Sequence, residues 1–531
     1  MFKKLHIIGI MILLSAGAYS QWTPEAIKLM EVMDKVSRYY VDSINENKIV
    51  EDAITHLLHE LDPHSSYINK EDLDEMNEQL EGEFEGIGVS FNILQDTIFI
   101  IRAISGGPAE IVGIRAGDRI VEVDGENVAG IGITTKGVQS RLKGEKGTRV
   151  NVKVQRRKVD GLLEFNITRD KIPVFSLDAS YMINERIGYI KLARFSQTTT
   201  IEFENAIKDL QRTGMKDLIL DLSGNGGGWL PIAVELADHF LDNDKVIVST
   251  EGRMVSTREY KARRKGLFEE GKLVVMIDQN SASASEIVSG AVQDWDRGVI
   301  VGRRSFGKGM VQQPFYLNDG SMIRLTVARY YTPTGRLIQK PYEDGYEDYA
   351  MDLINRYNKG ELNSSDSIIF PESQRYKTLV LKRTVYGGGG IMPDYFVPID
   401  TTSYSVYYRD LMNRGIFNQF ILKYVDNHRG ELKRSYPDFR TYKNHYEPSE
   451  PLLNELIGFA GEEGLTFNEK QWNISKSQIK LLVKGYIARD LFETGSFYEI
   501  YNESDPLYLK AVEILENPGL HQAKLAKADT E

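Results

Sequence analysis

The chain has 531 residues, of which 41% are hydrophobic and 27% charged, so it is long enough for several folded domains and too apolar for a disordered chain. It has no cysteine, which excludes disulfides, thiolate nucleophiles and cysteine-based metal sites. The formal net charge of −11 argues against nucleic acid or an anionic membrane surface as the main partner.

The first twenty residues have the pattern of a secretory signal peptide. Lys3 and Lys4 form a basic start, residues 6–14 form a short and mostly apolar run, and the segment AYS at 18–20 offers small residues before a cleavage site. The run is too short to span a bilayer comfortably, although an uncleaved N-terminal anchor is the alternative. We expect cleavage near residue 20, a periplasmic location and no stable membrane insertion of the mature chain.

Residues 21–83 are predicted to be helical. Thr23 is a suitable N-cap, and Pro24 suits the first helical position. Apolar residues recur at helical spacing over 29–36 and again over 50–61, which predicts two amphipathic helices, the second ending before Pro63.

From residue 84 to residue 172 the hydrophobic pattern changes and predicts a small β-rich domain. Alternation typical of strands occurs in TIFIIRAI, DRIVEVDGENV and RVNVKVQR, the second of which contains an Asp-Gly turn. A helical pattern occurs in TTKGVQSRL.

Strand and helix patterns alternate over residues 173–400, which predicts a layered α/β domain with parallel strand pairing. Strand patterns occur in RIGYIKL, KDLILDLSG, KLVVMID and GVIVG. Residues 401–531 are predicted to form a C-terminal helical domain, in which Ser475 and Gln478 fit a capping box at a helix start.

The segment NSASASEIVSG, at 280–290, carries three serines between a predicted strand and a predicted helix. In layered α/β domains, sites lie at the carboxyl ends of such strands, and the N-terminus of the following helix favours an oxyanion. A serine at this turn is therefore placed for nucleophilic catalysis. The alternative is structural, because Ser283 and Glu286 also fit the capping box S-x-x-E.

The segment RSFGKGMVQ places Lys308 between two glycines and among apolar residues. A lysine can act as a general base if its pKa falls from about 10.4 toward about 7, and apolar burial lowers it. Gln312 carries a neutral amide that could orient the amine. The alternatives are a surface lysine and, because GRRSFGKG nearly matches a P-loop, nucleotide binding; Gly309 stands where a P-loop requires Ser or Thr.

The segment DLSGNGGGW, at 221–229, forms a glycine-rich turn after a predicted buried strand. Glycines allow backbone N–H groups to turn toward a ligand, and one such group with the amide after a nucleophile would form an oxyanion hole. A flexible turn without a catalytic role is the alternative.

These segments together resemble the carboxyl-terminal processing peptidases, also called tail-specific serine proteases. The resemblance rests on NSASASEIVSGAVQD, GRRSFGKGMVQ, DLSGNGGG, LDPHSSY, GGGGIMPD and a GIGV module, and it covers about residues 40–400. It implies a multidomain α/β fold with a ClpP/crotonase-like layered protease core and a PDZ-like domain. It also implies a Ser–Lys dyad, with Ser283 as nucleophile and Lys308 as general base.

The resemblance assigns further roles by position. Gln312 matches the glutamine of the family's lysine motif, and the amides of Gly227 and Ala284 match its oxyanion donors. The family usually has Arg and Pro in this turn, as DLRxNPGG, where this chain has Ser223 and Gly226.

The GIGV module implies a peptide-binding groove. Ile87, Gly88 and Val89 would bind the terminal carboxylate of a substrate, with a preference for an apolar last residue.

We therefore expect an exported serine endopeptidase that cleaves near the C-terminal tails of proteins and needs neither a cofactor nor a metal. The histidines at 56, 59 and 64 show no zinc-site spacing and are interpreted as surface or packing residues. The apolar stripes at 29–36 and 479–487 could form a homodimer or dock a regulatory partner. The alternatives are a PDZ-bearing scaffold on an inactive peptidase fold and an acyl-CoA enzyme of the crotonase type.

Overall fold

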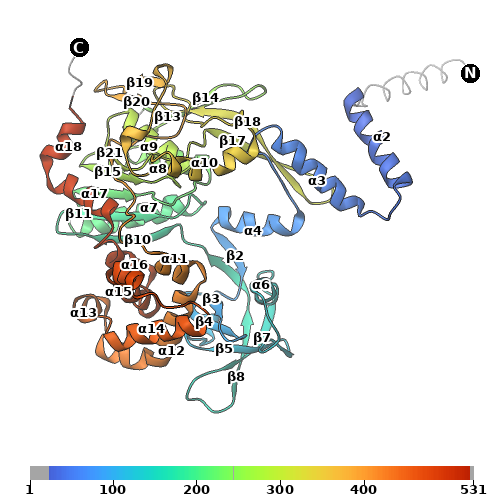
Figure 1. The fold of residues 1–531 in the computed structure, drawn as a ribbon, viewed down its shortest axis with the longest axis vertical. Helices are drawn as coiled ribbons and strands as arrows, with labels where there is room; N and C mark the ends of the chain where they lie inside the picture. Colours follow the sequence, from blue (N-terminus) through green and yellow to red (C-terminus); the bar gives the residue numbers. More distant parts are fainter. Residues whose placement is uncertain (1–22, 243, 527–531) are drawn as a thin grey trace, which may run out of the picture.

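The computed structural model describes residues 23–242 and 244–526, so the predicted signal peptide lies outside the described residues. The expected α/β multidomain architecture is confirmed. Figure 1 shows a layered core, with a β-rich domain and a bundle of helices lying together on one side of it.

The core is built on a six-stranded sheet of order β10-β11-β12-β15-β16-β21. β10 pairs antiparallel with β11, and the other neighbours pair in parallel. Four of these strands are buried along their whole length, as their continuous apolar pattern predicted. The strands are β10 (Leu177–Met182), β11 (Ile187–Leu192), β12 (Asp217–Asp221), β15 (Leu273–Ile277), β16 (Val299–Gly302) and β21 (Tyr395–Phe396).

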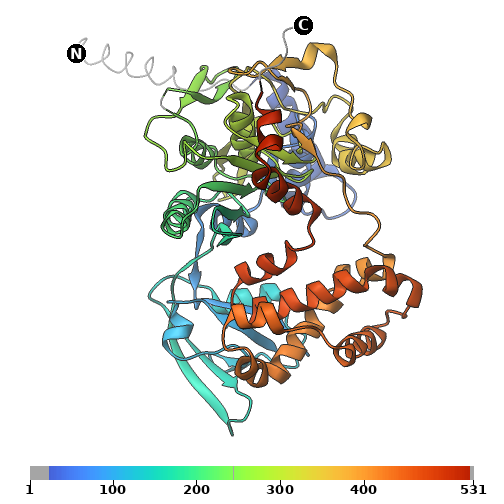
Figure 2. The same cartoon turned by 90° about the vertical axis from the view of Figure 1, so that its left-hand side faces the viewer.

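Helices cover both faces of this sheet. On one face lie α7 (Thr199–Arg212), α8 (Leu230–Asp238) and α9 (Ala284–Asp294), which share the largest apolar cluster with it. On the other face lies α17 (Pro506–Glu516), followed by α18 (Pro518–Lys524), and Figure 2 shows these dark red helices against the core. The end of the chain therefore completes the core, although the boundary at residue 401 assigns it to the C-terminal domain.

A second sheet, of order β1-β18-β13-β14 with β17 paired to β18, lies beside the core. The pairing of β1 with β18 places Ser66 opposite Arg324. It therefore brings the LDPHSSY segment against a strand of the protease core. The strands are β1 (Ser66–Ile68), β13 (Val246–Glu251), β14 (Arg258–Lys261), β17 (Met310–Tyr316) and β18 (Met322–Tyr331).

The β-rich domain has a sheet of order β3-β4-β5-β7-β8, with β6 paired to β5, around its own apolar cluster. A two-stranded ladder of β2 (Glu83–Gly86) and β9 (Asp170–Pro173) connects it to the core. Its other elements are β3 (Val89–Ile93), β4 (Ile98–Ala103), α5 (Pro108–Ile111), β5 (Arg119–Val123), β6 (Glu126–Asn127), α6 (Thr135–Leu142), β7 (Arg149–Gln155) and β8 (Leu162–Thr168).

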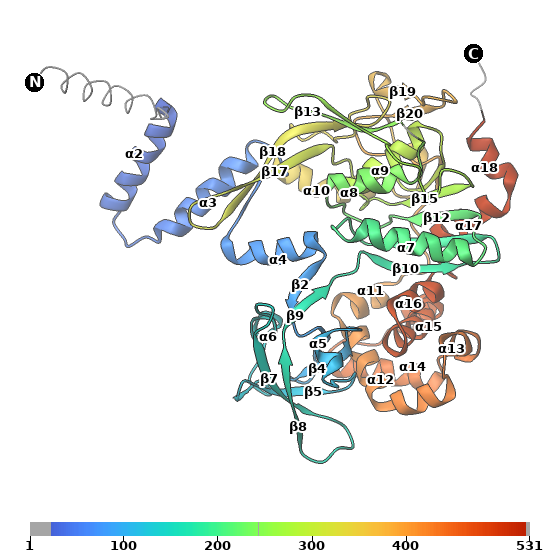
Figure 3. The ribbon, with the colours of Figure 1, turned by 180° about the vertical axis from the view of Figure 1, so that it is seen from behind.

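The C-terminal helices form a bundle with a separate apolar cluster, and Figure 3 shows it beside the β-rich domain. Asp426 joins the two regions through an ion pair with Arg119 at 2.8 Å. The capping box predicted for Ser475 is wrong, because Ser475 lies inside α15 and Asn468 is the N-cap. The helices are α11 (Val406–Asn413), α12 (Ile416–Ser435), α13 (Phe439–His445), α14 (Glu450–Glu462), α15 (Glu469–Leu491) and α16 (Thr494–Tyr501).

The N-terminal region consists of α2 (Pro24–Tyr39), α3 (Glu46–His59) and α4 (Lys70–Glu81). Thr23 caps α2 by accepting the N–H of Ala26, as predicted. No residue of α2 is buried, and Figure 1 shows α2 and α3 extending away from the core. Within the described ranges, no helix is both long enough and apolar enough to cross a membrane.

Candidate active site

Three serines occupy the turn between β15 and α9, and their hydroxyl groups differ in their contacts. The Ser281 hydroxyl donates to the carbonyl oxygen of Leu222 at 2.8 Å, and the Ser285 hydroxyl donates to that of Asn225 at 2.9 Å. Both fasten the turn to the glycine-rich loop after β12. The Ser283 hydroxyl donates no hydrogen bond among residues 23–242 and 244–526, so its proton is available for transfer to a base.

Ser283 is the N-cap of α9 and has an unusual backbone conformation. Its φ of 56° with ψ of −112° lies outside the regions that residues other than glycine normally adopt. Strain of this kind persists where the surroundings enforce it, and it concentrates at active sites. Ser283 and Glu286 form the capping box that the S-x-x-E pattern predicted, with the Glu286 carboxylate accepting the Ser283 N–H at 2.9 Å, so the structural and the catalytic interpretations of this serine are compatible.

Glu286 is fully buried, and its carboxylate accepts four hydrogen bonds. Oε2 accepts the N–H groups of Ser283 and Lys308, each at 2.9 Å. Oε1 accepts the Ser305 hydroxyl at 2.5 Å and the Gly307 N–H at 2.8 Å. Burial raises the pKa of Glu286, and the four donors oppose this rise. One carboxylate therefore holds the backbones of the predicted nucleophile and the predicted base together.

Lys308 lies in the loop between β16 and β17 and is partly buried. Burial, and then the charge of Arg324, lowers its pKa to about 8, while Glu286 and Asp62 favour the charged form. A pKa near 8 leaves a usable fraction of neutral amine for general-base chemistry. No hydrogen bond joins the Ser283 hydroxyl to the Lys308 amine in the described part of the chain, so the contacts through Glu286 bring together the two backbones rather than the reactive atoms.

A buried tyrosine links the same two residues from another side. The Tyr330 hydroxyl lies 3.2 Å from the carbonyl oxygen of Ser283 and also contacts that of Lys308. Burial raises the pKa of Tyr330 well above its usual range, so the hydroxyl keeps its proton and acts as a donor.

The predicted orienting residue, Gln312, lies on β17 close to the N-terminal segment. Its amide donates to the Thr326 hydroxyl at 3.3 Å, and that hydroxyl donates to Asp62 at 3.0 Å. Asp62 also accepts the Ser65 hydroxyl at 2.6 Å. The LDPHSSY segment therefore supplies a buried carboxylate to the wall of the site.

His64, in the same segment, lies close enough to Lys308 for their charges to interact, and its Nε2 is 3.0 Å from the Tyr349 hydroxyl. Burial, and then the charge of Lys308, lowers the pKa of His64 to about 4. Its ring is therefore uncharged at neutral pH. His64 packs, as interpreted from the sequence, but it does so beside the predicted base.

The glycine-rich loop approaches the nucleophile closely. Gly227 has φ of 100°, and a Cβ added there would lie 2.7 Å from the Ser283 Cβ and 3.0 Å from the Ala284 nitrogen, so only glycine fits. The two predicted oxyanion donors differ. The Gly227 N–H donates to Asn225 Oδ1 at 2.9 Å, whereas the Ala284 N–H has no partner among the residues that the structure describes.

The predicted carboxylate-binding residues lie together in the β-rich domain. Ile87, Gly88 and Val89 line a cavity of about 390 Å³ between β3 and α6, with Leu142 of α6 on its apolar wall. β3 is the terminal strand of its sheet, so its outer edge faces this cavity. An extended peptide could pair with such an edge.

Sequence reasoning missed several residues of the site. Glu286 was considered only as half of a capping box, yet it joins the two motifs. Asp62 enters the sequence analysis only as part of a family segment, His64 only as a surface or packing residue, and Asn225 is not singled out there. The signal was present in S-x-x-E and LDPHSSY, but local patterns do not show which distant backbone a carboxylate will meet.

Three family models match parts of this chain. Peptidase family S41 matches residues 186–348, a PDZ domain matches residues 99–156, and a family of unknown function (DUF8443) matches residues 407–493. The β-rich domain is therefore a PDZ domain.

Named relatives extend the match over most of the chain. The carboxy-terminal-processing protease of Bartonella bacilliformis is 37% identical over 348 residues, which are 62% of this chain and 79% of the relative. Carboxy-terminal processing protease CtpA of Bacillus subtilis is 33% identical over 337 residues, 63% of this chain and 71% of the relative. Among solved structures, the photosystem II D1 C-terminal processing protease is 30% identical over 60% of this chain and 91% of its own, with a TM-score of 0.33. The resemblance inferred from the motifs is thus confirmed, and this chain belongs to the carboxy-terminal processing proteases, a family of serine proteases within peptidase family S41.

Proposed function

We propose that this protease hydrolyses peptide bonds near the C-terminal tails of proteins, with Ser283 as nucleophile and Lys308 as general base. The proposal is carried by one observation: a single carboxylate oxygen of Glu286 accepts the N–H groups of both residues at 2.9 Å. The lowered pKa of Lys308, about 8, supports the role of base, and the family supports proteolysis.

The proposed reaction follows from these groups. Neutral Lys308 takes the proton of the Ser283 hydroxyl as its oxygen attacks the peptide carbonyl carbon. The tetrahedral intermediate collapses, the peptide C–N bond breaks, and the Lys308 ammonium protonates the leaving amine. Water, deprotonated by Lys308, then hydrolyses the ester on Ser283.

We propose the N–H groups of Ala284 and Gly227 as donors to the oxyanion. Ala284 is supported by its position at the start of α9, where the helix N-terminus favours negative charge. Gly227 must share its N–H between the substrate and Asn225 Oδ1, or Asn225 must turn away when substrate binds. Gln312 is proposed to orient the Lys308 amine, supported by its position two residues into β17 and its link through Thr326 to Asp62.

Substrate tails are proposed to bind along β3 of the PDZ domain. Ile87, Gly88 and Val89 would bind the terminal carboxylate and an apolar last side chain, supported by the cavity that these residues line.

We also propose that residues 1–20 direct export to the periplasm. Divisions at residues 83, 172 and 400 are proposed to separate the N-terminal helices, the PDZ domain, the protease core and the C-terminal helices. Of the two apolar stripes considered as docking surfaces, the one at 479–487 packs inside the helical bundle, because its apolar side chains belong to the buried cluster there. The exposed apolar side chains of α2 support a homodimer or a regulatory partner at that helix.

Peptide cleavage tests the dyad. Ser283→Ala and Lys308→Ala should each abolish turnover of a peptide with an apolar C-terminus, because each removes a group that no neighbour replaces. Ser289→Ala is the matched control, since Ser289 is a buried serine of the same helix whose hydroxyl only donates to the Ser285 carbonyl at 2.8 Å. Turnover that survives in either dyad variant would refute the assignment.

The alternative is a binding protein on an inactive fold. A fluorophosphonate probe that reacts with activated serines separates the two, because labelling at Ser283 requires a competent nucleophile. Sequencing the N-terminus of the protein isolated from the periplasm tests export, with a start near Gln21 as the expected result and a start at Met1 as the opposite one.

A further inference from the structure

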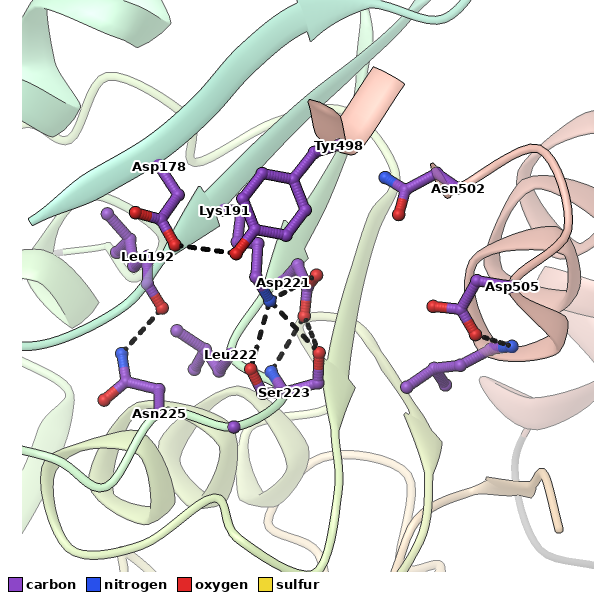
Figure 4. A network of polar contacts seen from close by, with 12 residues as sticks. Asp178, Lys191, Leu192, Asp221, Leu222, Ser223, Asn225, Tyr498, Asn502 and Asp505 are labelled. Carbon is purple, nitrogen blue, oxygen red and sulfur yellow. Dashed lines mark hydrogen bonds and ion pairs between the residues drawn. The ribbon is translucent and has the colours of Figure 1, made fainter. Parts of the chain in front are cut away.

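The glycine-rich loop is anchored at its start by a second buried lysine. Lys191, on β11, donates to the Asp221 carboxylate at 2.9 Å and to the Ser223 carbonyl oxygen at 3.1 Å, as Figure 4 shows. Asp221 in turn accepts the N–H and the hydroxyl of Ser223, at 2.8 Å and 2.5 Å, and the Tyr189 hydroxyl at 2.6 Å. The ion pair therefore sets the position at which the loop leaves β12.

The same loop is hydrogen-bonded to the turn that holds the nucleophile. Asn225 donates to the Leu192 carbonyl oxygen at 2.9 Å, and its own carbonyl oxygen accepts the Ala282 N–H at 3.0 Å. Gly227 follows two residues later and lies so close to Ser283 that an added Cβ would be 2.7 Å from the Ser283 Cβ. A displacement at Ser223 would therefore shift the loop against the turn that holds Ser283.

The ion pair is covered by the C-terminal domain. Tyr498 of α16 places its ring 5.3 Å from the Lys191 Nζ, and its hydroxyl donates to Asp178 of β10 at 3.0 Å. On the next turn, Asn502 donates to the Tyr181 hydroxyl at 2.9 Å. Figure 4 shows Tyr498 standing over Lys191 and Asp221. Lys191 is 9% exposed and Asp221 3% exposed, so little water reaches the pair while this helix is in place.

We propose that Tyr498 is a positioning residue for catalysis, and that the C-terminal helical domain is a structural part of the catalytic centre because it seals the Lys191–Asp221 pair. The inference rests on the proposed function. Without the Tyr498 ring, water would compete for the Asp221 carboxylate and the Ser223 carbonyl oxygen, and the loop would gain alternative positions. The oxyanion donor at Gly227 would then be misplaced in part of the population.

The test compares two tyrosines of the C-terminal domain. Tyr442 is the matched control, because it is fully buried and its hydroxyl donates to the Lys484 carbonyl oxygen at 2.9 Å inside the bundle. We expect Tyr498→Leu to lower kcat about tenfold with KM unchanged, less than the hundredfold that a misplacement of about 1 Å can cost. Tyr498→Phe, which keeps the ring, should lower kcat only about twofold to threefold, while Tyr442→Phe and Tyr442→Leu leave kcat unchanged in the folded enzyme.

A readout that does not depend on turnover accompanies the kinetics. Hydrogen exchange of the segment 222–228 should become faster in Tyr498→Leu and stay unchanged in Tyr442→Leu. The proposal is overturned if the Tyr498 variants alter only KM, which would indicate substrate recruitment, or if they resemble the Tyr442 variants in kcat and in exchange. If Tyr498→Leu does not fold, Tyr498→Phe and Asp178→Asn decide, and unchanged kcat in both overturns the proposal.

The two proposals fail separately. A wild-type enzyme that cleaves no peptide counts against the proposed function, whereas an active wild type with insensitive Tyr498 variants counts only against this inference.

Discussion

Two lysines of the protease core, Lys191 on β11 and Lys308 in the loop between β16 and β17, differ in how a nearby carboxylate is used. Asp221 binds the Lys191 amine directly, at 2.9 Å. Near Lys308, the carboxylate of Glu286 is committed to four other donors, two of them the N–H groups of Ser283 and Lys308 itself. The Asp221 carboxylate therefore fixes the Lys191 amine in a structural contact, whereas the Glu286 carboxylate accepts three backbone N–H groups and the Ser305 hydroxyl and, within the described residues, makes no direct bond to the Lys308 amine.

We expect the largest effects on activity and stability from replacing each lysine with methionine. Lys308→Met should abolish turnover and leave the fold intact, because the half-buried amine is replaced by an apolar chain of similar length. Lys191→Met should destabilise the protein by about 3–5 kcal/mol, because it leaves the buried Asp221 without its cation. Chemical denaturation and peptide cleavage measure the two effects, and a stable Lys191→Met enzyme would contradict the difference between the sites.

Substitution of Gly227 tests the contact between the anchored loop and the nucleophile. Gly227→Ala would force a positive φ on a residue with a side chain and place its Cβ 2.7 Å from that of Ser283. We expect kcat to fall by about 10²–10³, as for loss of an oxyanion donor. Gly224→Ala is the control, since it has a positive φ but no atom within 4 Å of an added Cβ. Equal losses of kcat in both variants would show that backbone strain at a positive φ, and not the contact with Ser283, causes the loss.

The pH dependence of kcat/KM tests whether the neutral amine of Lys308 is the active form. Since its pKa is about 8 and the neutral amine is the active form, kcat/KM should rise with pH and level off above about 8. Glu286→Gln removes a negative charge that raises this pKa, so the rising limb should move to lower pH, while kcat falls about tenfold with the loss of charged hydrogen bonds.

Glu202→Gln provides the matched control for Glu286. The Glu202 carboxylate accepts the N–H groups of Ser176 and Leu177, at 2.9 Å and 3.0 Å, away from the dyad. Its replacement should lower the stability of the protein without changing the pH at which kcat/KM rises. If the rise of kcat/KM occurs at the same pH in Glu286→Gln as in the wild type, Glu286 only holds the backbone.

The smallest expected effect lies in the PDZ domain, remote from both lysines. Val89→Glu places a charge at the cavity that is proposed to take an apolar last residue, so KM for tail peptides should rise about threefold to tenfold with kcat unchanged. Val159→Glu, at an exposed position of the same domain, is the control. An unchanged KM in peptide cleavage, together with an unchanged affinity for tail peptides in isothermal titration calorimetry, would argue against tail binding at β3.

Local patterns predicted much of the architecture. The alternation of strands and helices over 173–400 predicted the layered core, and Thr23 and Pro24 predicted the start of α2, because these signals act within one turn or one strand. Ser475 and Gln478 gave a false start inside α15, since the Ser475 hydroxyl donates to Ser405, seventy residues away in sequence, at 2.9 Å. A polar residue in a helix cannot be distinguished from a cap until its partner is known.

The amino-acid sequence by itself determined the family, the serine turn, the lysine loop and the glycine-rich turn, because each is a short motif whose chemistry resides in neighbouring residues. Only the tertiary structure decided that Glu286 joins two of these motifs, that Asp62 and His64 reach the site through the pairing of β1 with β18, and that Tyr498 covers Lys191. Apart from the bond between Ser283 and Glu286, these contacts join residues 22 to more than 300 positions apart, and their geometry is set by how sheets and helices pack rather than by local propensity.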